Sequence, residues 1–169
     1  LISSLQLIYG HYIKISEQKA DYRIEVIKSD ALYNVHFAEN ICATKYPLRE
    51  IYKIIFENAI YNDCVFALHG SAVEWNGGAY IFLASTTSGK TTLASYLVNC
   101  GFNYITDDCI LLKRENFKIY PYSTPIHLRD GGLAVLKRYN AAPREVKILD
   151  AGYTRRYTYM PNNCIRNET

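Results

Sequence analysis

An eight-residue run near the middle of the chain has the residue types that bind phosphate: residues 84–91 read ASTTSGKT. Apart from alanine at the first position, where glycine is usual, this is the phosphate-loop pattern. The backbone N–H groups of such a loop surround the phosphates of a nucleotide, and Gly89 lets the backbone come close. The predicted nucleotide contacts are Ser85, Thr86, Thr87, Ser88, Gly89, Lys90, Thr91 and Thr92.

The last residues of the run supply a charge and a hydroxyl group. Lys90 would place a positive charge on the outer phosphates, and the Thr91 hydroxyl is the expected ligand of Mg²⁺. A helix that starts near Lys90 directs the positive end of its dipole at the same anion. Ala84 requires a negative φ where glycine allows either sign, which re-aims the loop but removes no ligand.

Two adjacent carboxylates follow the next predicted strand. Asp107 and Asp108 come directly after residues 102–105, which follow the helix of the phosphate loop. In a strand–helix–strand crossover the strands lie near one another, so one carboxylate can reach a Mg²⁺ ion held by Thr91. The other carboxylate can then accept a proton from an attacking hydroxyl group. The ordinary alternative is a solvated turn.

A histidine precedes the strand that pairs with the strand of the phosphate loop. His69 follows the apolar residues 64–68, and Asn76-Gly77 predicts a hairpin between residues 72–75 and 79–84. A single histidine in such a place is more often structural than catalytic. Its position nevertheless makes His69 a candidate member of the site.

The surrounding pattern predicts an α/β protein. Residues 79–84 carry no charge and are apolar on both faces, which is typical of a central buried strand. The next segment has Leu93, Leu97 and Val98 on one face and Gly101 as a C-terminal cap, which predicts a helix.

The N-terminal residues indicate strands, with a turn at residues 29–30, before Pro47 opens another helix. We therefore expect a β-rich N-terminal section over residues 1–46 and a nucleotide-binding core over residues 47–169, together one compact domain.

Composition excludes several functional classes. The chain has 169 residues, of which 49% are hydrophobic and 21% charged, and these are ordinary values for a globular protein. A net charge of +3 is too small to predict nucleic-acid binding. The 16 tyrosines favour half-buried strands, with a recognition surface as the alternative. The five scattered cysteines and the lack of a long apolar run predict a cytoplasmic protein without a membrane segment.

The order and spacing of these motifs resemble the catalytic domain of HPr kinase/phosphorylase and its relatives. The resemblance covers roughly residues 64–130, from LHGSAVE at residues 68–74 through the phosphate loop to Asp107-Asp108. Those relatives include small kinases that modify precursor peptides, among them kinases of lasso-peptide pathways that phosphorylate a serine. Thr92 stands where the bifunctional HPr enzyme commonly has glutamate, and the later signature EVRGLG of that enzyme is missing. The smaller kinases are therefore the closer match.

The resemblance implies a fold and roles for the site residues. The fold would be a P-loop core similar to those of HPr kinase and phosphoenolpyruvate carboxykinase, with the β-rich N-terminal section added. Lys90 would contact the phosphates, while Thr91 and Asp108 would hold Mg²⁺. Asp107 would be the general base for the acceptor serine, and His69 would lie beside the γ-phosphate.

The resemblance also concerns the remainder of the chain. Arg129 lies in a proline-bounded segment similar to one in the family, which makes it a candidate substrate contact, with a solvated surface arginine as the alternative. A full kinase of this type continues past residue 169. The oligomeric state stays open, with a homo-oligomer among the candidates.

We therefore expect ATP- and Mg²⁺-dependent phosphoryl transfer to a serine hydroxyl of a peptide or protein, in first place a ribosomal-peptide precursor. Two alternatives remain open. A pocket too narrow for a peptide would favour a small-molecule or carboxykinase-like kinase. Nucleotide binding without transfer would indicate a sensing module, although binding alone needs only one of the two aspartates.

Overall fold

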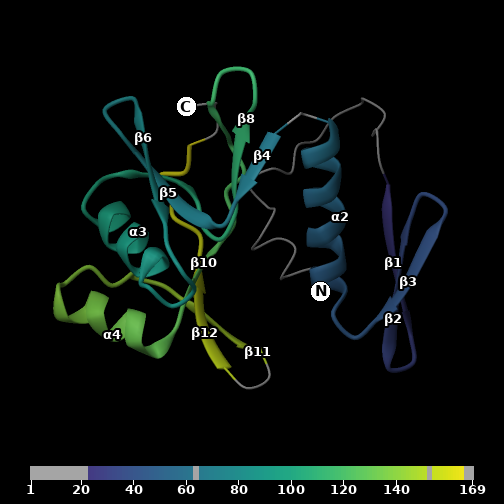
Figure 1. Cartoon of the computed structure of the whole chain (residues 1–169). Coiled ribbons are helices and arrows are strands. Elements are labelled where there is room, and N and C mark those ends of the chain that lie inside the picture. Colours follow the sequence, from purple (N-terminus) through teal and green to yellow (C-terminus); the bar gives the residue numbers. More distant parts are fainter. Residues whose placement is uncertain (1–22, 63–64, 152–153, 166–169) are drawn as a thin grey trace. The chain divides into compact units, whose positions relative to one another are not determined.

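The computed structural model describes residues 23–62, 65–151 and 154–165, and it divides into two units, Leu1–Asp63 and Cys64–Thr169 (Figure 1). The first unit contains the strands β1 (Ile24–Ser29), β2 (Leu32–Phe37) and β3 (Asn40–Thr44) and the helix α2 (Pro47–Asn62). Its strands form an antiparallel sheet in the order β1-β2-β3.

Helix α2 belongs to the first unit. It begins at Pro47 as predicted, and it contacts β2 and β3. Val35 of β2 and Ile51 of α2 are both buried. The division after Asp63 therefore groups α2 with the N-terminal strands, whereas the sequence pattern placed this helix with the nucleotide-binding core.

The second unit contains the predicted site. Its elements are β4 (Val65–Leu68), β5 (Gly70–Trp75), β6 (Gly78–Leu83), α3 (Lys90–Asn99), β7 (Asn103–Thr106), β8 (Ile110–Lys113), β9 (Ile119–Tyr120), β10 (Ile126–Leu128), α4 (Asp130–Arg138), β11 (Lys147–Ala151) and β12 (Thr154–Tyr159). Helices and strands are mixed in this unit. The described strands form small antiparallel sheets, in the orders β6-β5-β7, β4-β8-β9 and β10-β12-β11, rather than the mostly parallel central sheet typical of an α/β protein.

The sheet β6-β5-β7 brings the ends of three strands together. Both β6 and β7 run antiparallel to β5, so they are parallel to each other, and α3 crosses over between them. The hairpin at Asn76-Gly77 is confirmed, with φ values of 53° and 81° at its two central residues. The C-terminal ends of β6 and β7 and the start of β5 consequently lie at one end of the sheet. The phosphate loop, Asp107 and His69 follow or precede these ends directly.

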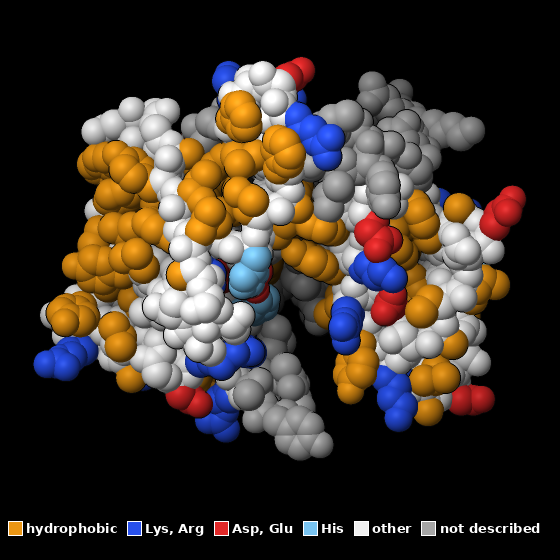
Figure 2. Space-filling model, in the orientation of Figure 1, with side chains coloured by type: hydrophobic (Ala, Val, Ile, Leu, Met, Phe, Trp, Pro, Cys, Tyr) orange, Lys and Arg blue, Asp and Glu red, His pale blue; other side chains and the backbone are white. Residues whose placement is uncertain are grey.

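The prediction that β6 is a central buried strand is wrong. Strand β6 lies at the edge of its sheet, and Tyr80 and Leu83 are 50% and 57% exposed. Figure 2 shows hydrophobic side chains exposed on the side where β6 lies in Figure 1. The central strand is β5, because the crossover through α3 places β7 on the other side of β5. An uncharged run shows that a strand tolerates burial. Whether the strand lies at the centre or the edge of its sheet depends on how strands far apart in the sequence pair.

Two buried clusters pack on β5 and β7. Val73 and Tyr104 contribute to one cluster with side chains of α3, α4 and β10, while Ala72 and Ile105 contribute to the other with Ile110 and Ile119 of β8 and β9. Successive residues of a strand point to opposite faces, which explains why neighbours enter different clusters. No helix in the described ranges has the length and apolar character needed to cross a membrane.

Helix α3 ends as predicted. Gly101 has a φ of 105°, and its N–H donates to the carbonyl of Val98 while the N–H of Phe102 donates to that of Leu97. This is a Schellman motif, in which glycine accepts the left-handed conformation without strain.

Gly70 is the tightest point beside the site. A Cβ atom at this position would lie 2.7 Å from the carbonyl oxygen of Phe82 and within 2.9 Å of the side chains of Leu83 and Ile110. We expect Gly70→Ala to lower the free energy of unfolding by about 1–3 kcal/mol, because a backbone oxygen and two packed side chains would have to move. Urea unfolding followed by circular dichroism measures the change.

Gly78 provides the matched control at the other end of the same strand pair. A Cβ atom there would meet only the carbonyl oxygen of Trp75, at an ordinary distance of 3.6 Å. Gly78→Ala should change the free energy of unfolding by less than about 0.5 kcal/mol. Equal losses in both variants would show that strand flexibility, and not the close approach at Gly70, sets the cost.

Candidate functional site

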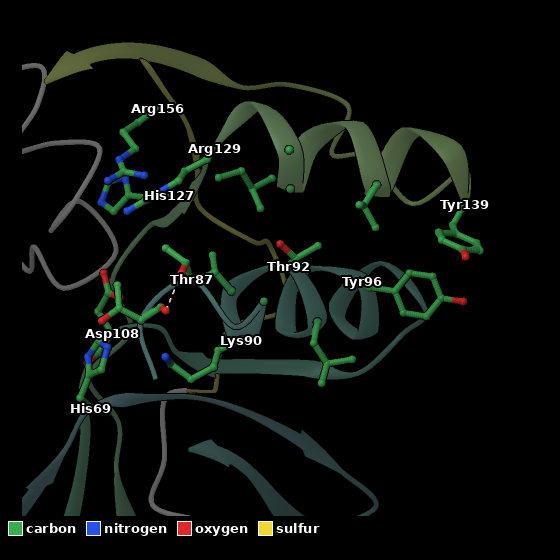
Figure 3. Close-up of a pocket in the computed structure, with 18 residues that line it drawn as sticks. His69, Thr87, Lys90, Thr92, Tyr96, Asp108, His127, Arg129, Tyr139 and Arg156 are labelled. Atoms are coloured by element: carbon green, nitrogen blue, oxygen red, sulfur yellow. Dashed lines mark hydrogen bonds between the residues drawn. The ribbon is translucent and has the colours of Figure 1, made fainter. Parts of the chain in front are cut away.

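A pocket of about 1050 Å³ lies between α3 and α4 (Figure 3). Gly132 approaches Thr92 near the start of both helices, and the rings of Tyr96 and Tyr139 meet further along. The two helices are therefore parallel, and their N-termini lie at the same end of the pocket. Because a helix N-terminus carries a partial positive charge, this end favours an anion.

The phosphate loop forms part of the pocket wall. Thr87 and Gly89 have positive φ values of 68° and 99°, and the N–H of Ser88 donates to the carbonyl of Ser85. Gly89 is the N-cap of α3 and supplies no side chain to the first N–H groups of that helix. These groups remain available to an anion, as in other phosphate loops. Of the predicted contacts, six line the pocket, namely Thr86, Thr87, Gly89, Lys90, Thr91 and Thr92, whereas Ser85 and Ser88 do not.

Lys90 is folded onto the loop. Only 9% of the residue is exposed, and its Nζ donates to the carbonyl oxygens of Ala84 and Ser85 at 2.8 and 2.9 Å. A buried ammonium group needs such acceptors. Phosphate oxygens would provide stronger, charged acceptors close to the same place.

Asp107 contacts the phosphate loop through Thr91. The Thr91 hydroxyl donates to Asp107 Oδ1 at 3.1 Å, and the Ser71 hydroxyl donates to the same oxygen at 2.5 Å. The side chain of Thr124 donates to the backbone carbonyl of Asp107 and holds the turn. Asp107, and not Asp108, is thus the carboxylate that reaches Thr91, whereas the sequence-based assignment paired Thr91 with Asp108.

The second oxygen of Asp107 suits a metal ion. Asp107 Oδ2 is buried and has no hydrogen-bond partner among the described residues. In the described ranges, no group of three or more His, Cys, Asp and Glu side chains could hold a metal by itself. Mg²⁺ at nucleotide sites is bound by one or two carboxylates together with phosphate oxygens, so Asp107 beside the Thr91 hydroxyl fits this ion.

Burial raises the pKa of Asp107 to about 6, from an ordinary value of 3.8. The neighbouring charge of Asp108 raises it further, while the hydrogen bonds from Ser71 and Thr91 oppose the shift. In the metal-free protein this carboxylate therefore titrates close to neutral pH.

The shift predicts a pH-dependent stability. Between pH 6 and pH 4 the folded state holds a proton at Asp107 that the unfolded state releases, so lowering the pH through this window stabilises the fold. We expect the metal-free protein to gain about 2–3 kcal/mol from Asp107 between pH 7 and pH 4. Chemical denaturation across this range should show the gain in the wild type relative to Asp107→Asn. If the free energy of unfolding changed with pH in the same way in both proteins, the predicted contribution of Asp107 would be wrong.

Asp108 and His69 line the pocket next to each other (Figure 3). Asp108 is exposed and has a positive φ of 66°, a conformation that aspartate tolerates better than most residues. His69 Nδ1 lies 3.0 Å from the backbone oxygen of Asp108. Because a carbonyl oxygen only accepts, Nδ1 carries the hydrogen, and Nε2 is the acceptor nitrogen of the neutral ring.

Cationic and histidine side chains complete this end of the pocket. Arg129 lies directly before α4 and lines the pocket, as do His127 of β10 and Arg156 of β12. His127 Nδ1 lies 2.8 Å from the Thr158 hydroxyl, and burial lowers the pKa of His127. The sequence pattern singled out Arg129 but did not assign Ser71, His127 or Arg156 to the site. The proximity of His127 to Arg129 in the chain was the available signal.

Comparisons of the chain with protein-family models, curated proteins and solved structures give no match.

Proposed function

We propose that the chain is an ATP-dependent kinase that transfers a phosphoryl group to a serine hydroxyl of a peptide or protein, and that its second unit has a P-loop core like that of HPr kinase. The observation that carries the proposal is the meeting of three groups at one end of the pocket. These groups are the phosphate loop, Asp107 on the Thr91 hydroxyl, and the pocket-lining pair Asp108 and His69.

The geometry favours a division of roles opposite to the sequence-based one. Asp107 is 1% exposed and bonded to Thr91, while Asp108 lies on the pocket surface. A general base must reach the proton that it accepts, and reach is the first requirement before its pKa. We therefore assign Asp108 as the base and Asp107, with Thr91, as the carboxylate that would hold Mg²⁺.

The transfer then proceeds by direct displacement. The serine Oγ forms a bond to the γ-phosphorus of ATP, and the bond from that phosphorus to the β–γ bridging oxygen breaks. ADP leaves with the electron pair of the broken bond, and the serine proton passes to the Asp108 carboxylate. When bound, Mg²⁺ neutralises charge on the β- and γ-phosphates.

Charged side chains of the chain position the phosphates. Lys90 exchanges its loop carbonyls for phosphate oxygens, and the N–H groups at the start of α3 add further donors. Arg129 and Arg156 lie at the same end and can stabilise the charge of the transferred group or of the acceptor. Positioning and charge stabilisation supply most of the catalysis in this reaction class.

The serine acceptor rests on the resemblance to small HPr-kinase relatives, and the cytoplasmic location rests on the scattered cysteines. The thiols of Cys42, Cys100 and Cys109 are free, which is consistent with a reducing compartment. Transfer to a small-molecule acceptor would use the same phosphate loop, Lys90 and Asp108.

Transfer from γ-labelled ATP with Mg²⁺ tests the proposal. The acceptors are candidate peptides encoded beside this gene, and each is offered to the wild type and to Asp108→Asn. Label on a peptide serine that appears only with the wild type supports a peptide kinase. Tight ATP binding without label on any peptide would transfer the proposal to a small-molecule acceptor, and no ATP binding would end it.

A further inference from the structure

The end of the pocket away from Asp108 is aromatic. Tyr96 of α3 and Tyr139, which follows α4, have ring centroids 6.2 Å apart and ring planes at 79°. Leu93 and Val135, three and four residues before these tyrosines and so on the same side of the chain's helical turns, also line the pocket and are exposed. We call this part the tyrosine end. In Figure 3 it lies opposite Asp108 and His69.

We propose that the tyrosine end binds the base of the nucleotide. The inference rests on the proposed function, because it uses the phosphate loop as the site of the triphosphate. Tyr96 lies six positions beyond Lys90, which corresponds to a rise of about 9 Å along α3. This distance is comparable with the span from the phosphate chain of a nucleotide to its base.

The direction of transfer favours the nucleotide over the acceptor at this end. In an in-line displacement the attacking oxygen and the leaving ADP lie on opposite sides of the γ-phosphorus. Asp108 marks the side of the attacking hydroxyl, so the nucleoside must extend away from Asp108. Along the pocket this direction leads past Thr92 to Tyr96.

Two glycines line the middle of the groove, and they differ in the space around them. Gly131 and Gly132 begin α4 and line the pocket. A Cβ atom at Gly132 would lie 2.8 Å from the Thr92 hydroxyl oxygen, while one at Gly131 would meet nothing within 4 Å. Gly132 therefore packs directly against Thr92, while the open space at Gly131 lets the backbone of α4 approach a sugar and phosphate chain between the phosphate loop and the tyrosine end.

The side chains at the tyrosine end can recognise the face of a base better than its edge. Two aromatic rings offer stacking or edge contacts, and Leu93 and Val135 add apolar surface. Stacking is tolerant of base identity because every base has an aromatic face. We therefore expect GTP to compete with ATP within about tenfold.

Binding of two probes separates the base from the phosphates. Isothermal titration with Mg²⁺ compares ATP with inorganic tripolyphosphate, which has no base, for the wild type and Tyr96→Ala. We expect Tyr96→Ala to weaken ATP binding by about 10- to 100-fold and tripolyphosphate binding by less than about twofold. Tyr96→Phe keeps the ring and should bind ATP as the wild type does.

Tyr80 supplies a matched control outside the pocket. It is half-exposed and meets the ring of Phe102 edge-on at 6.2 Å, much as Tyr96 meets Tyr139. Tyr80→Ala should leave both affinities unchanged.

The outcomes distinguish failure of this inference from failure of the proposed function. ATP binding that Tyr96→Ala does not change would overturn the base site alone. Equal weakening of ATP and tripolyphosphate would also overturn it, because Tyr96 would then support the phosphate loop. A preference for ATP over GTP clearly beyond about tenfold would contradict recognition by stacking. If neither ATP nor tripolyphosphate binds the wild type, the proposed function itself fails.

Discussion

Replacement of Lys90 by alanine is expected to lower the rate of phosphoryl transfer by about 10²–10³-fold, the usual cost of removing a donor that faces developing charge. The ammonium group already lies over the phosphate loop, bonded to the carbonyls of Ala84 and Ser85. It therefore needs little movement to meet a phosphate, and only a small part of its hydration remains to be lost. Steady-state transfer from γ-labelled ATP measures the effect.

The matched control is Lys118→Ala. Lys118 is exposed in the segment before β9 and does not line the pocket, so its loss removes the same charge without touching the site. Unfolding curves for both variants check that neither substitution destabilises the fold of the second unit. Transfer by Lys90→Ala within about threefold of the wild type would contradict a role for this loop in phosphate binding.

The second large effect concerns the two aspartates, and it separates the geometric assignment from the sequence-based one. Asp108→Asn should lower the transfer rate by about 10²–10⁴-fold, because an amide cannot accept the serine proton. The Kd of Mg²⁺-ATP should change little, since the carboxylate that is hydrogen-bonded to Thr91 belongs to Asp107.

Asp107→Asn should show the complementary pattern. The amide can still accept from Ser71 and Thr91 at one atom, but it has lost the buried carboxylate charge that suits a divalent ion. We expect the Mg²⁺ concentration for half-maximal ATP binding to rise by about 10- to 100-fold. Glu115→Gln, in the exposed turn after β8, is the control for loss of one acid. The reverse pattern, with Mg²⁺-dependent binding lost in Asp108→Asn, would restore the sequence-based roles.

Those two roles differ because adjacency in sequence does not determine direction in space. The turn after β7 sends Asp107 inward to Ser71 and Thr91, whereas a left-handed backbone at Asp108 leaves its side chain at the pocket. Neither outcome is encoded in the dipeptide itself. It depends on β5 and α3, which supply the hydroxyl groups that Asp107 meets.

Features governed by local chemistry were determined by the sequence alone. The turn at Asn76-Gly77 needs residues that accept positive φ, the end of α3 needs such a residue at Gly101, and the phosphate loop needs Gly89 before a helix. In each case the conformation is decided by a few neighbouring residues, so a short pattern is sufficient. The order of strand, loop and helix also predicted that one of the two aspartates would come close to Thr91, but it did not identify that aspartate as Asp107.

Tertiary structure alone decided the features that depend on distant pairing. Strand β6 is at an edge because β5 pairs with both β6 and β7, which no property of its apolar residues could indicate. The pocket exists because α4 packs parallel to α3 through Gly132, bringing Tyr139 to Tyr96 and Arg129 to the phosphate loop. Such contacts join residues far apart in the chain, and their geometry follows from the packing of whole elements rather than from local preference.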